Sequence, residues 1–280
     1  ISVENAGGEL VLGTGQGGLV ISPKEEPRRS EERPFLPPTA ASGGQEPQEE
    51  LAAPVNPVQE SLPPVLFAGK ITGSWAAAYR TTVDSAANTT IELDPASGLI
   101  AFDDGRAGTI LPGTSTTLRD GGDSLISWGR WVNGITGGSG AFAGKDTRLA
   151  PLHWVAGLST PSMPTGTASY AMIGATPPSC VTGCAATLNG SSLLVNFDAA
   201  SVGLNMDITI AGTRYTTSPG DITLTIAGST FSGSGSVGCV GPSMFAAGFF
   251  AGDAAARAGL AYHIGPVNQD VNGAIAYIKQ

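Results

Sequence analysis

The sequence predicts an all-β protein: an antiparallel up-and-down β-barrel of about eight strands, preceded by a proline-rich extended linker and a short N-terminal β segment. Three observations predict this fold. Apolar and polar residues alternate with a period of two in many short segments, which places one face of each strand against a core. Turn-forming sequences separate these segments. The chain contains 40 Gly and 20 Pro but only 13% charged residues, which favours strands and tight turns over surface helices.

The first 22 residues read as short strands separated by glycine turns, at residues 1–5, 9–12 and 18–21. This pattern, with its Gly15-Gln16-Gly17 step, resembles the end of a FecR-type periplasmic domain. The resemblance implies that residues 1–22 are the last strands of an N-terminal β domain.

Residues 23–63 have a different composition, because prolines recur throughout and alternate with charged residues such as Glu25, Glu26, Arg28 and Arg29. Proline removes a backbone donor and fixes φ, so neither a helix nor a sheet can propagate through this segment. We expect an extended strap that is ordered by contact with another chain. Its apolar residues are the candidate contacts: Phe35, Leu36, Leu51, Val55, Val58 and Leu62.

Residues 64–280 carry the barrel pattern, since four segments share an alternating apolar face. The positions expected inside the barrel are Leu193, Val195, Phe197, Leu204, Met206, Ile208, Ile222, Leu224, Ile226, Leu260 and Ile264. Turns are expected at residues 94–98, 103–105, 189–190, 218–220 and 272–273, which combine Asp, Asn, Pro and Gly. Closing the sheet into a barrel would remove its exposed edges.

The run from Gly248 to Tyr262 places two Gly- and Phe-rich strand pieces on either side of an alanine turn. Asp253 is expected to cap this turn and Gly259 to end it. The run resembles the late barrel hairpin of the surface lipoproteins of the transferrin-binding protein B and factor H-binding protein type. The segments 166–170 and 271–280 resemble other strands of those barrels, so the resemblance covers residues 65–280. Arg257 departs from it, because an acidic residue is common there.

The resemblance implies a cell-surface or envelope protein of a Gram-negative bacterium that binds a protein or a small iron ligand and catalyses no reaction. The net charge of −9 and the pI near 4.6 argue against binding to nucleic acid. No apolar stretch in the sequence approaches the roughly 18 residues that a membrane-spanning helix needs.

The cysteines are Cys180, Cys184 and Cys239, which in an oxidising compartment allow one disulfide and one free thiol. Cys180 and Cys184 flank a short turn and form the simplest pair, although Cys239 could pair with either. A zinc site is the alternative, but Cys-x3-Cys without a nearby histidine is a weak metal signature.

Residues 233–238 match the G-x-G-x-x-G pattern, yet the following Cys-Val-Gly-Pro cannot begin the helix that a dinucleotide site requires. His153 and His263 lack a recognisable nucleophile or metal-binding motif and are expected to be packing or surface residues, with haem or metal ligation as the alternative. Asp103, Asp104, Asp120 and Asp123 lack the spacing of a calcium loop and are expected to cap turns. We therefore predict no catalytic, cofactor or metal site.

Trp128, Trp131 and Trp154 are the aromatic candidates for contact with a partner. Because Trp128 and Trp131 are three residues apart on a strand, their side chains should lie on opposite faces, one interior and one exterior. An exposed tryptophan would be a strong binding residue.

The sequence thus favours a non-catalytic module that engages another protein. Two other functions stay open. One is a structural subunit of an envelope or extracellular assembly that is held by the 23–63 strap. The other is an iron or haem carrier, which would need a hollow barrel lined by His153, His263 or tyrosines.

Overall fold

The computed structural model describes residues 2–5, 8–11, 18–19, 28–29, 69–96, 98–104, 108–237, 241–265 and 270–280. The chain divides into two compact units, Ile1–Val58 and Gln59–Gln280. In the first unit, β1 (Ser2–Asn5) pairs with β2 (Gly8–Val11), and β3 (Gly18–Leu19) pairs with β4 (Arg28–Arg29), both antiparallel. These short strands fit the expected N-terminal β segment, and its FecR-type origin stays a prediction.

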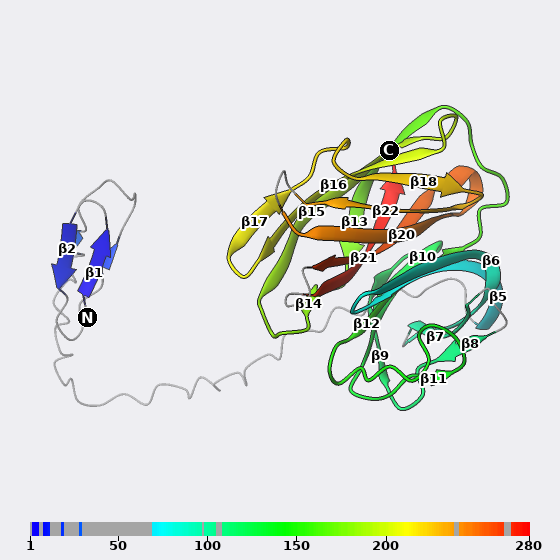
Figure 1. The fold of residues 1–280 in the computed structure, drawn as a ribbon, viewed down its shortest axis with the longest axis horizontal. Coiled ribbons are helices and arrows are strands. Elements are labelled where there is room, and N and C mark those ends of the chain that lie inside the picture. The colour runs from blue at the N-terminus through cyan, green and yellow to red at the C-terminus, as the bar shows by residue number, and fades with distance from the viewer. Residues whose placement is uncertain are drawn as a thin grey trace, which may run out of the picture. The chain divides into compact units, whose positions relative to one another are not determined.

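Eight strands of the second unit close into an antiparallel barrel, which confirms the predicted fold class (Figure 1). The order is β13-β15-β16-β18-β19-β20-β21-β22, and β22 pairs back with β13. The bounds of these strands are β13 Thr167–Ala175, β15 Ala186–Asn196, β16 Ser201–Ile210, β18 Thr223–Ala227, β19 Thr230–Ser236, β20 Ser243–Ala251, β21 Arg257–Gly265 and β22 Val271–Lys279.

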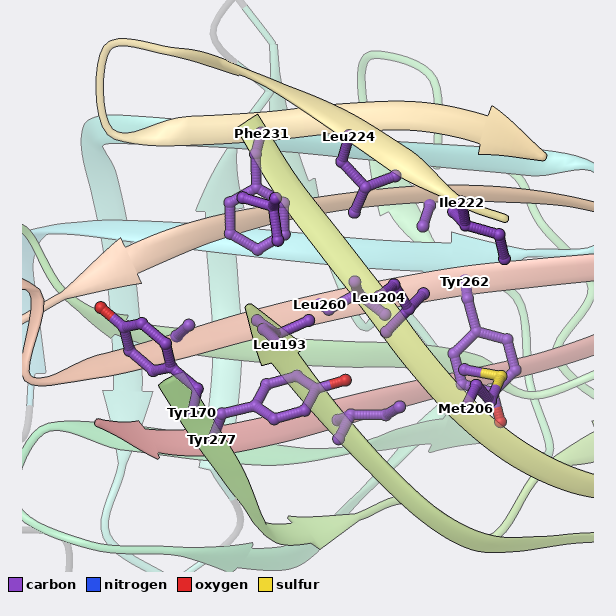
Figure 2. Close-up of a cluster of buried hydrophobic side chains, with 14 of the residues drawn as sticks. Tyr170, Leu193, Leu204, Met206, Ile222, Leu224, Phe231, Leu260, Tyr262 and Tyr277 are labelled. Atoms are coloured by element: carbon purple, nitrogen blue, oxygen red, sulfur yellow. The ribbon is translucent and has the colours of Figure 1, made fainter. Parts of the chain in front are cut away.

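Apolar side chains fill the interior of this barrel, as Figure 2 shows for ten labelled residues. Along β16, buried and half-buried residues alternate strictly over all ten positions, as a strand with one dry face requires. Of the eleven positions predicted to lie inside, nine are buried, and Phe197 and Ile226 are partly buried against the same cluster. The core prediction is confirmed.

Two short strands extend the barrel sheet. β14 (Ser179–Cys180) pairs with β22, and β17 (Thr213–Thr216) pairs with β16 beyond the point where β18 ends. Thr217 bridges the remaining gap, because its hydroxyl accepts from the amide of Met206 and donates to the carbonyl of Leu204. A side chain thus replaces ladder hydrogen bonds in the wall.

The alanine turn between β20 and β21 is a 3₁₀ helix, η1 (Asp253–Ala255), and it differs from the prediction. Gly252 with φ 73° occupies the N-cap position that the sequence assigned to Asp253. Gly259 lies inside β21 instead of ending the turn. A Cβ on Gly259 would approach the ring of Phe249 to 2.7 Å and Val155 to 2.9 Å, so this glycine allows close packing rather than a turn.

Two predicted turns also lie inside strands. Asn189 and Gly190 belong to β15, where the register with β16 shifts between Leu188 and Gly190. Asn272 and Gly273 belong to β22, and the ring of Tyr262 covers Gly273. At Gly273 the glycine makes room for a neighbouring side chain, whereas at Asn189-Gly190 the pair lies at an irregularity in the β15–β16 register.

Residues 69–158 form a second, open sheet of eight strands in the order β11-β8-β7-β6-β5-β12-β10-β9. The bounds are β5 Gly69–Tyr79, β6 Thr82–Asp94, β7 Gly98–Asp103, β8 Thr109–Leu111, β9 Thr116–Gly122, β10 Ile126–Val132, β11 Gly137–Gly138 and β12 Leu152–Leu158. The closed barrel therefore occupies the later part of the 64–280 region, and the assignment of that whole region to one barrel domain stays a prediction.

Both faces of the open sheet are buried along its central strands β5, β12 and β10. One face curls around an aromatic core that contains Trp75, Trp131, Trp154, Phe102 and Phe142. The other face packs on the outer wall of the barrel through a cluster of small and apolar residues: Ala76, Ala78, Ile126, Trp128 and Val155 from the sheet, and Phe249, Ala251, Ala261, Ala274 and Ala276 from the barrel. Alanines and glycines on both sides allow the two backbones to approach closely.

Candidate protein-binding surface

An irregular surface, formed by residues 111–115 and 133–149, lies at the end of the open sheet away from the barrel (Figure 1). We call it the loop platform. β11 pairs with β8, so that Gly137 lies opposite Leu111, and Ile135 forms an isolated bridge with Asp146. The amide of Leu149 donates to the carbonyl of Asp146. These bonds bring three sequence-distant segments together.

Two buried threonines hold the loop platform in one conformation. The hydroxyl of Thr136 donates to the carbonyl of Phe142 at 2.5 Å and accepts from the amide of Lys145 at 2.8 Å. The hydroxyl of Thr147 accepts from the amide of Gly134 at 2.9 Å. Because each threonine fixes backbone groups that no strand pairs, the loop is rigid without regular secondary structure.

Three large apolar side chains are exposed on this platform: Leu111 at 41%, Ile135 at 44% and Leu149 at 63%. Ile135 and Leu149 lie in the 133–149 loop, which also carries the buried ring of Phe142, and Leu111 is the last residue of β8, which pairs with β11. A rigid support lowers the entropy cost of presenting an apolar side chain to a partner. The platform therefore combines the apolar centre and the fixed backbone that binding surfaces need.

Charged groups border these apolar residues. The guanidinium of Arg148 donates to the carboxylate of Asp146 at 2.7 Å, and this hydrogen bond lowers the pKa of Asp146. The hydroxyl of Tyr79 donates to the backbone carbonyl of Asp146, and Lys145 lies 5.9 Å above the Tyr79 ring. Burial raises the pKa of Tyr79, so its hydroxyl stays protonated and keeps this hydrogen bond at physiological pH.

The predicted tryptophan contacts are all in the core. Trp131 and Trp154 are fully buried, and Trp128 is 7% exposed. Trp128 and Trp131 do point to opposite faces of the sheet, as expected, but the barrel covers one face and the aromatic core covers the other. The surface available to a partner must therefore come from other residues.

Each tryptophan has a specific structural role. The indole nitrogens of Trp75 and Trp131 donate to the carbonyls of Asp103 and Leu99, which fixes β7 across the curled face. The ring of Trp128 fits against two glycines, since a Cβ on Gly121 or Gly174 would meet it at 2.2 or 2.1 Å.

The strap residues proposed as contacts, Phe35, Leu36, Leu51, Val55, Val58 and Leu62, lie outside the described residues. Cys239 and Gly238 of the glycine motif also lie outside them. The preceding glycines, Gly233 and Gly235, belong to strand β19 of the barrel wall.

The two histidines are buried in hydrogen-bonded settings. His153 lies between the hydroxyls of Thr176 at 2.8 Å and Ser179 at 2.7 Å. Burial, together with the positive charge of Arg130, lowers the pKa of His153 to about 3. The Nε2 atom of His263 lies 3.0 Å from the carboxylate of Asp270. Within the described part of the chain, no three His, Cys, Asp or Glu side chains gather as a metal site would require.

The carboxylates considered for calcium serve turns and ion pairs. Asp104 accepts from the amide of Gly108, and Asp123 accepts from the amides of Leu125 and Ile126. Asp120 forms a two-bond ion pair with Arg130.

Cys180 and Cys184 form a disulfide with a Cα–Cα distance of 5.4 Å, which confirms the simplest predicted pairing. The disulfide closes the loop that follows β14, and the amide of Val181 donates to the carbonyl of Asp270. The disulfide thus restrains the segment that contains Ser179, whose hydroxyl is hydrogen-bonded to Nε2 of His153.

Sequence reasoning missed Leu111, Ile135 and Leu149. For Ile135 a signal was available, because it is an isolated large apolar residue between Gly134 and Thr136 with no alternating partners. Leu111 ends strand β8 and Leu149 lies between Arg148 and Ala150, so the local pattern does not mark these two as exposed.

No protein-family model matches the chain, and no curated protein matches it. Several solved structures of bacterial surface lipoproteins are similar to it in fold. A variant of transferrin-binding protein B from Haemophilus parasuis is 12% identical with a TM-score of 0.41, over 75% of this chain and 45% of that one. The protein of the same name from serogroup B Neisseria meningitidis is 10% identical with a TM-score of 0.41, over 75% and 44%.

The N-lobe domain of lactoferrin-binding protein B from Moraxella bovis is 11% identical with a TM-score of 0.37, over 75% of this chain and 99% of that domain. The chain matches somewhat less than half the length of the two transferrin-binding proteins. The similarity lies in the arrangement of strands, as the sequence resemblance implied, and no residue's role is transferred from it. A search of the described residues finds no helix with the length and apolarity needed to cross a membrane.

Proposed function

We propose that this chain is a non-catalytic module of the bacterial cell surface or envelope that binds another protein through the loop platform. The observation that carries the proposal is the fixed exposure of Leu111, Ile135 and Leu149 on backbone held by buried threonines. A large apolar side chain exposed on a rigid loop gains more on binding than it loses in conformational entropy.

The extracytoplasmic setting is supported by the Cys180–Cys184 disulfide, because such bonds persist in oxidising compartments. The sequence resemblance of residues 166–170, 248–262 and 271–280 to surface-lipoprotein barrels supports the same setting.

The iron or haem carrier is disfavoured by the barrel interior. Phe231, Phe250, Tyr170, Tyr262 and Tyr277 are buried there against aliphatic residues and leave no space for a macrocycle. The structural-subunit alternative depends on the strap at residues 23–63. Deleting residues 30–60 should abolish assembly under that alternative and leave binding at the loop platform unchanged under the proposed function.

The test places a photo-crosslinking amino acid at Leu149 in the full chain, expressed in its native cells. We expect a specific crosslinked protein. The double substitution Ile135→Asp, Leu111→Asp should reduce the yield of that crosslink by at least about tenfold, because both new carboxylates would have to be desolvated on binding.

The matched control carries the crosslinker at Leu194, a leucine on the barrel wall that is also more than half exposed, with the same double substitution. Thermal melting should be nearly unchanged in both proteins, because the substituted side chains are exposed. If Leu149 and Leu194 capture the same proteins, or if the double substitution leaves the Leu149 yield intact, the loop platform is not the binding surface.

A further inference from the structure

A second surface feature lies on the outer wall of the barrel, along the β15–β16 ladder. Two shallow hollows follow each other there. The larger, of about 310 Å³, is lined by residues on both sides of the Leu194–Gly203 pair, and includes Thr167, Asn196, Ser201, Pro219 and Thr223. The second, of about 280 Å³, is lined by residues around the Gly190–Asp207 pair, and includes Ser192, Asn205, Thr216 and Thr217. We call the two together the β15–β16 groove.

The hollows lie on one face and follow one direction. Leu193, Leu204 and Met206 point into the barrel, so the alternating residues Leu194, Gly203 and Asn205 face outward. Leu194 and Gly190 are four residues apart on the strand, which corresponds to about 13 Å between the centres of the two hollows. A ligand that fills both must therefore be elongated.

The groove offers side-chain hydroxyls rather than backbone groups. Over Ser192–Asn196, β15 is paired with β13 on one side and with β16 on the other, so its backbone at the larger hollow cannot accept an added strand. Among the described residues, no hydrogen bond engages the hydroxyls of Thr167, Ser201 and Thr223 or the amide nitrogen of Asn196. Each hydroxyl can donate and accept, which suits a ligand that itself carries many hydroxyls.

The lining is electrically neutral. The larger hollow is lined by no charged side chain. In the second, Asp207 forms a two-bond ion pair with Arg214, and this hydrogen bonding lowers the pKa of Asp207 to about 2. Asp198 and Asp221 bind the amides of Gly166 and Ser218, next to lining residues, and would repel an anion.

Apolar surface completes the groove. Leu194 is 53% exposed, and Pro219 closes over Gly203, where a Cβ would meet its carbonyl oxygen at 2.7 Å. The carbon-bound hydrogens of a pyranose ring can pack on such a leucine and proline, while its hydroxyls reach the threonine, serine and asparagine groups. At the larger hollow a peptide would find the same leucine and proline but no free strand edge to pair with.

We propose that the β15–β16 groove binds an extended neutral oligosaccharide. This site is on a different face from the loop platform and uses different residues, so it does not depend on the proposed protein partner.

The test titrates the isotopically labelled full chain with four neutral hexasaccharides of different linkage: maltohexaose, cellohexaose, laminarihexaose and chitohexaose. Hexagalacturonate is the anionic comparison. We expect at least one neutral hexasaccharide to shift the amide signals of Ser192, Leu194 and Gly203, while hexagalacturonate does not. Leu194→Ala and Thr223→Ala should each weaken binding by about tenfold, because each removes one contact without touching the core.

The matched controls are Ser234→Ala, on the outer face of β19, and Leu149→Ala on the loop platform, and both should bind as the unmodified chain does. The proposal is overturned if none of the four neutral sugars shifts the groove signals. It is also overturned if hexagalacturonate binds equally well, if the control variants weaken binding as much, or if a crosslinker at Leu194 captures a protein that competes with the sugar.

Discussion

The closed barrel and the open sheet bury their strands in different ways, although both are antiparallel. On β16 of the barrel, buried residues alternate with half-buried ones along the whole strand. On β12 of the open sheet, six successive residues are buried, and on β5 seven are. The barrel strand has one dry face, whereas the open-sheet strands are covered on both.

The difference shows which strands a period-two pattern can reveal. An alternating pattern reports a strand with one wet face, and it disappears when a second layer covers that face. On the covered faces the sequence instead uses small residues, such as Ala76 and Ala78 of β5, which belong to the same buried cluster as Ala261 and Ala274 of the barrel. Three experiments would break or sharpen this comparison.

The largest effect should come from Trp154→Ala in the middle of the open sheet. Trp154 is fully buried, and its ring lies against Gly98 and Gly129, so the substitution leaves a large cavity. We expect a loss of about 3–5 kcal/mol in the free energy of unfolding, measured by urea denaturation. The transition should stay single, because the sheet and the barrel share one buried interface.

The control for this substitution is Leu149→Ala, which is 63% exposed and should change stability by less than about 0.5 kcal/mol. Two separate transitions in Trp154→Ala, with the barrel unaffected, would mean that the open sheet is an independent layer and that its two-sided burial does not couple it to the barrel.

The second effect concerns the pH dependence of the free energy of unfolding. His153 is buried, so protonation of its ring in the folded protein is unfavourable. Its pKa is about 3 when folded and near 6.5 when unfolded. Between these values the unfolded chain binds the extra proton, so the contribution of His153 is complete above pH 6.5 and is lost as the pH falls towards 3. His153→Gln should therefore reduce the loss of stability between pH 7 and 4.5 by about 2 kcal/mol.

The measurement is urea denaturation of both proteins across that pH range. Above pH 7 the two stability profiles should run parallel, which provides the internal control. If the stability profiles of the two proteins stay parallel down to pH 4.5, His153 is protonated as easily in the folded protein as in the unfolded one. That result would contradict its burial between Thr176 and Ser179.

The smallest expected effect is the difference in stability between alanine substitutions at two strand glycines, Gly174 and Gly190. A Cβ at Gly174 would meet the ring of Trp128 at 2.1 Å, whereas a Cβ at Gly190 would find open space. Neither position needs a positive φ. We expect Gly174→Ala to cost about 1–3 kcal/mol and Gly190→Ala to be near neutral, by thermal and urea denaturation. Equal effects would mean that the sheet interface adjusts and is not closely packed.

The barrel core was predictable residue by residue. Leu204, Met206 and Ile208 alternate with polar neighbours, and all three are buried in the barrel. The Cys180–Cys184 pair was also predictable, because four residues of separation around a turn restrict the geometry. The open sheet was less predictable, since the Ala76–Ala78 run on β5 and the Leu152–Gly157 run on β12 carry no alternation.

The candidate site was not predictable from pattern. Trp128, Trp131 and Trp154 are the residues that composition favours for a binding surface, yet both faces of their sheet are covered. The segments that carry Leu111 and Ile135 are joined by the pairing of β8 with β11 and by the amide of Ile135, which donates to the hydroxyl of Thr114. Nothing in the local sequence encodes those long-range contacts.

By itself the sequence determined the all-β class, the inward faces of β15, β16, β18 and β21 and the simplest disulfide pairing, because strand periodicity and short loop closure are local physics. The tertiary structure decided which strands are covered twice, where glycines serve packing instead of turns, and which apolar residues stay exposed. These depend on what lies above each strand face, and the covering layer comes from residues far away in the chain, as the cluster that contains both Ala76 and Ala274 illustrates.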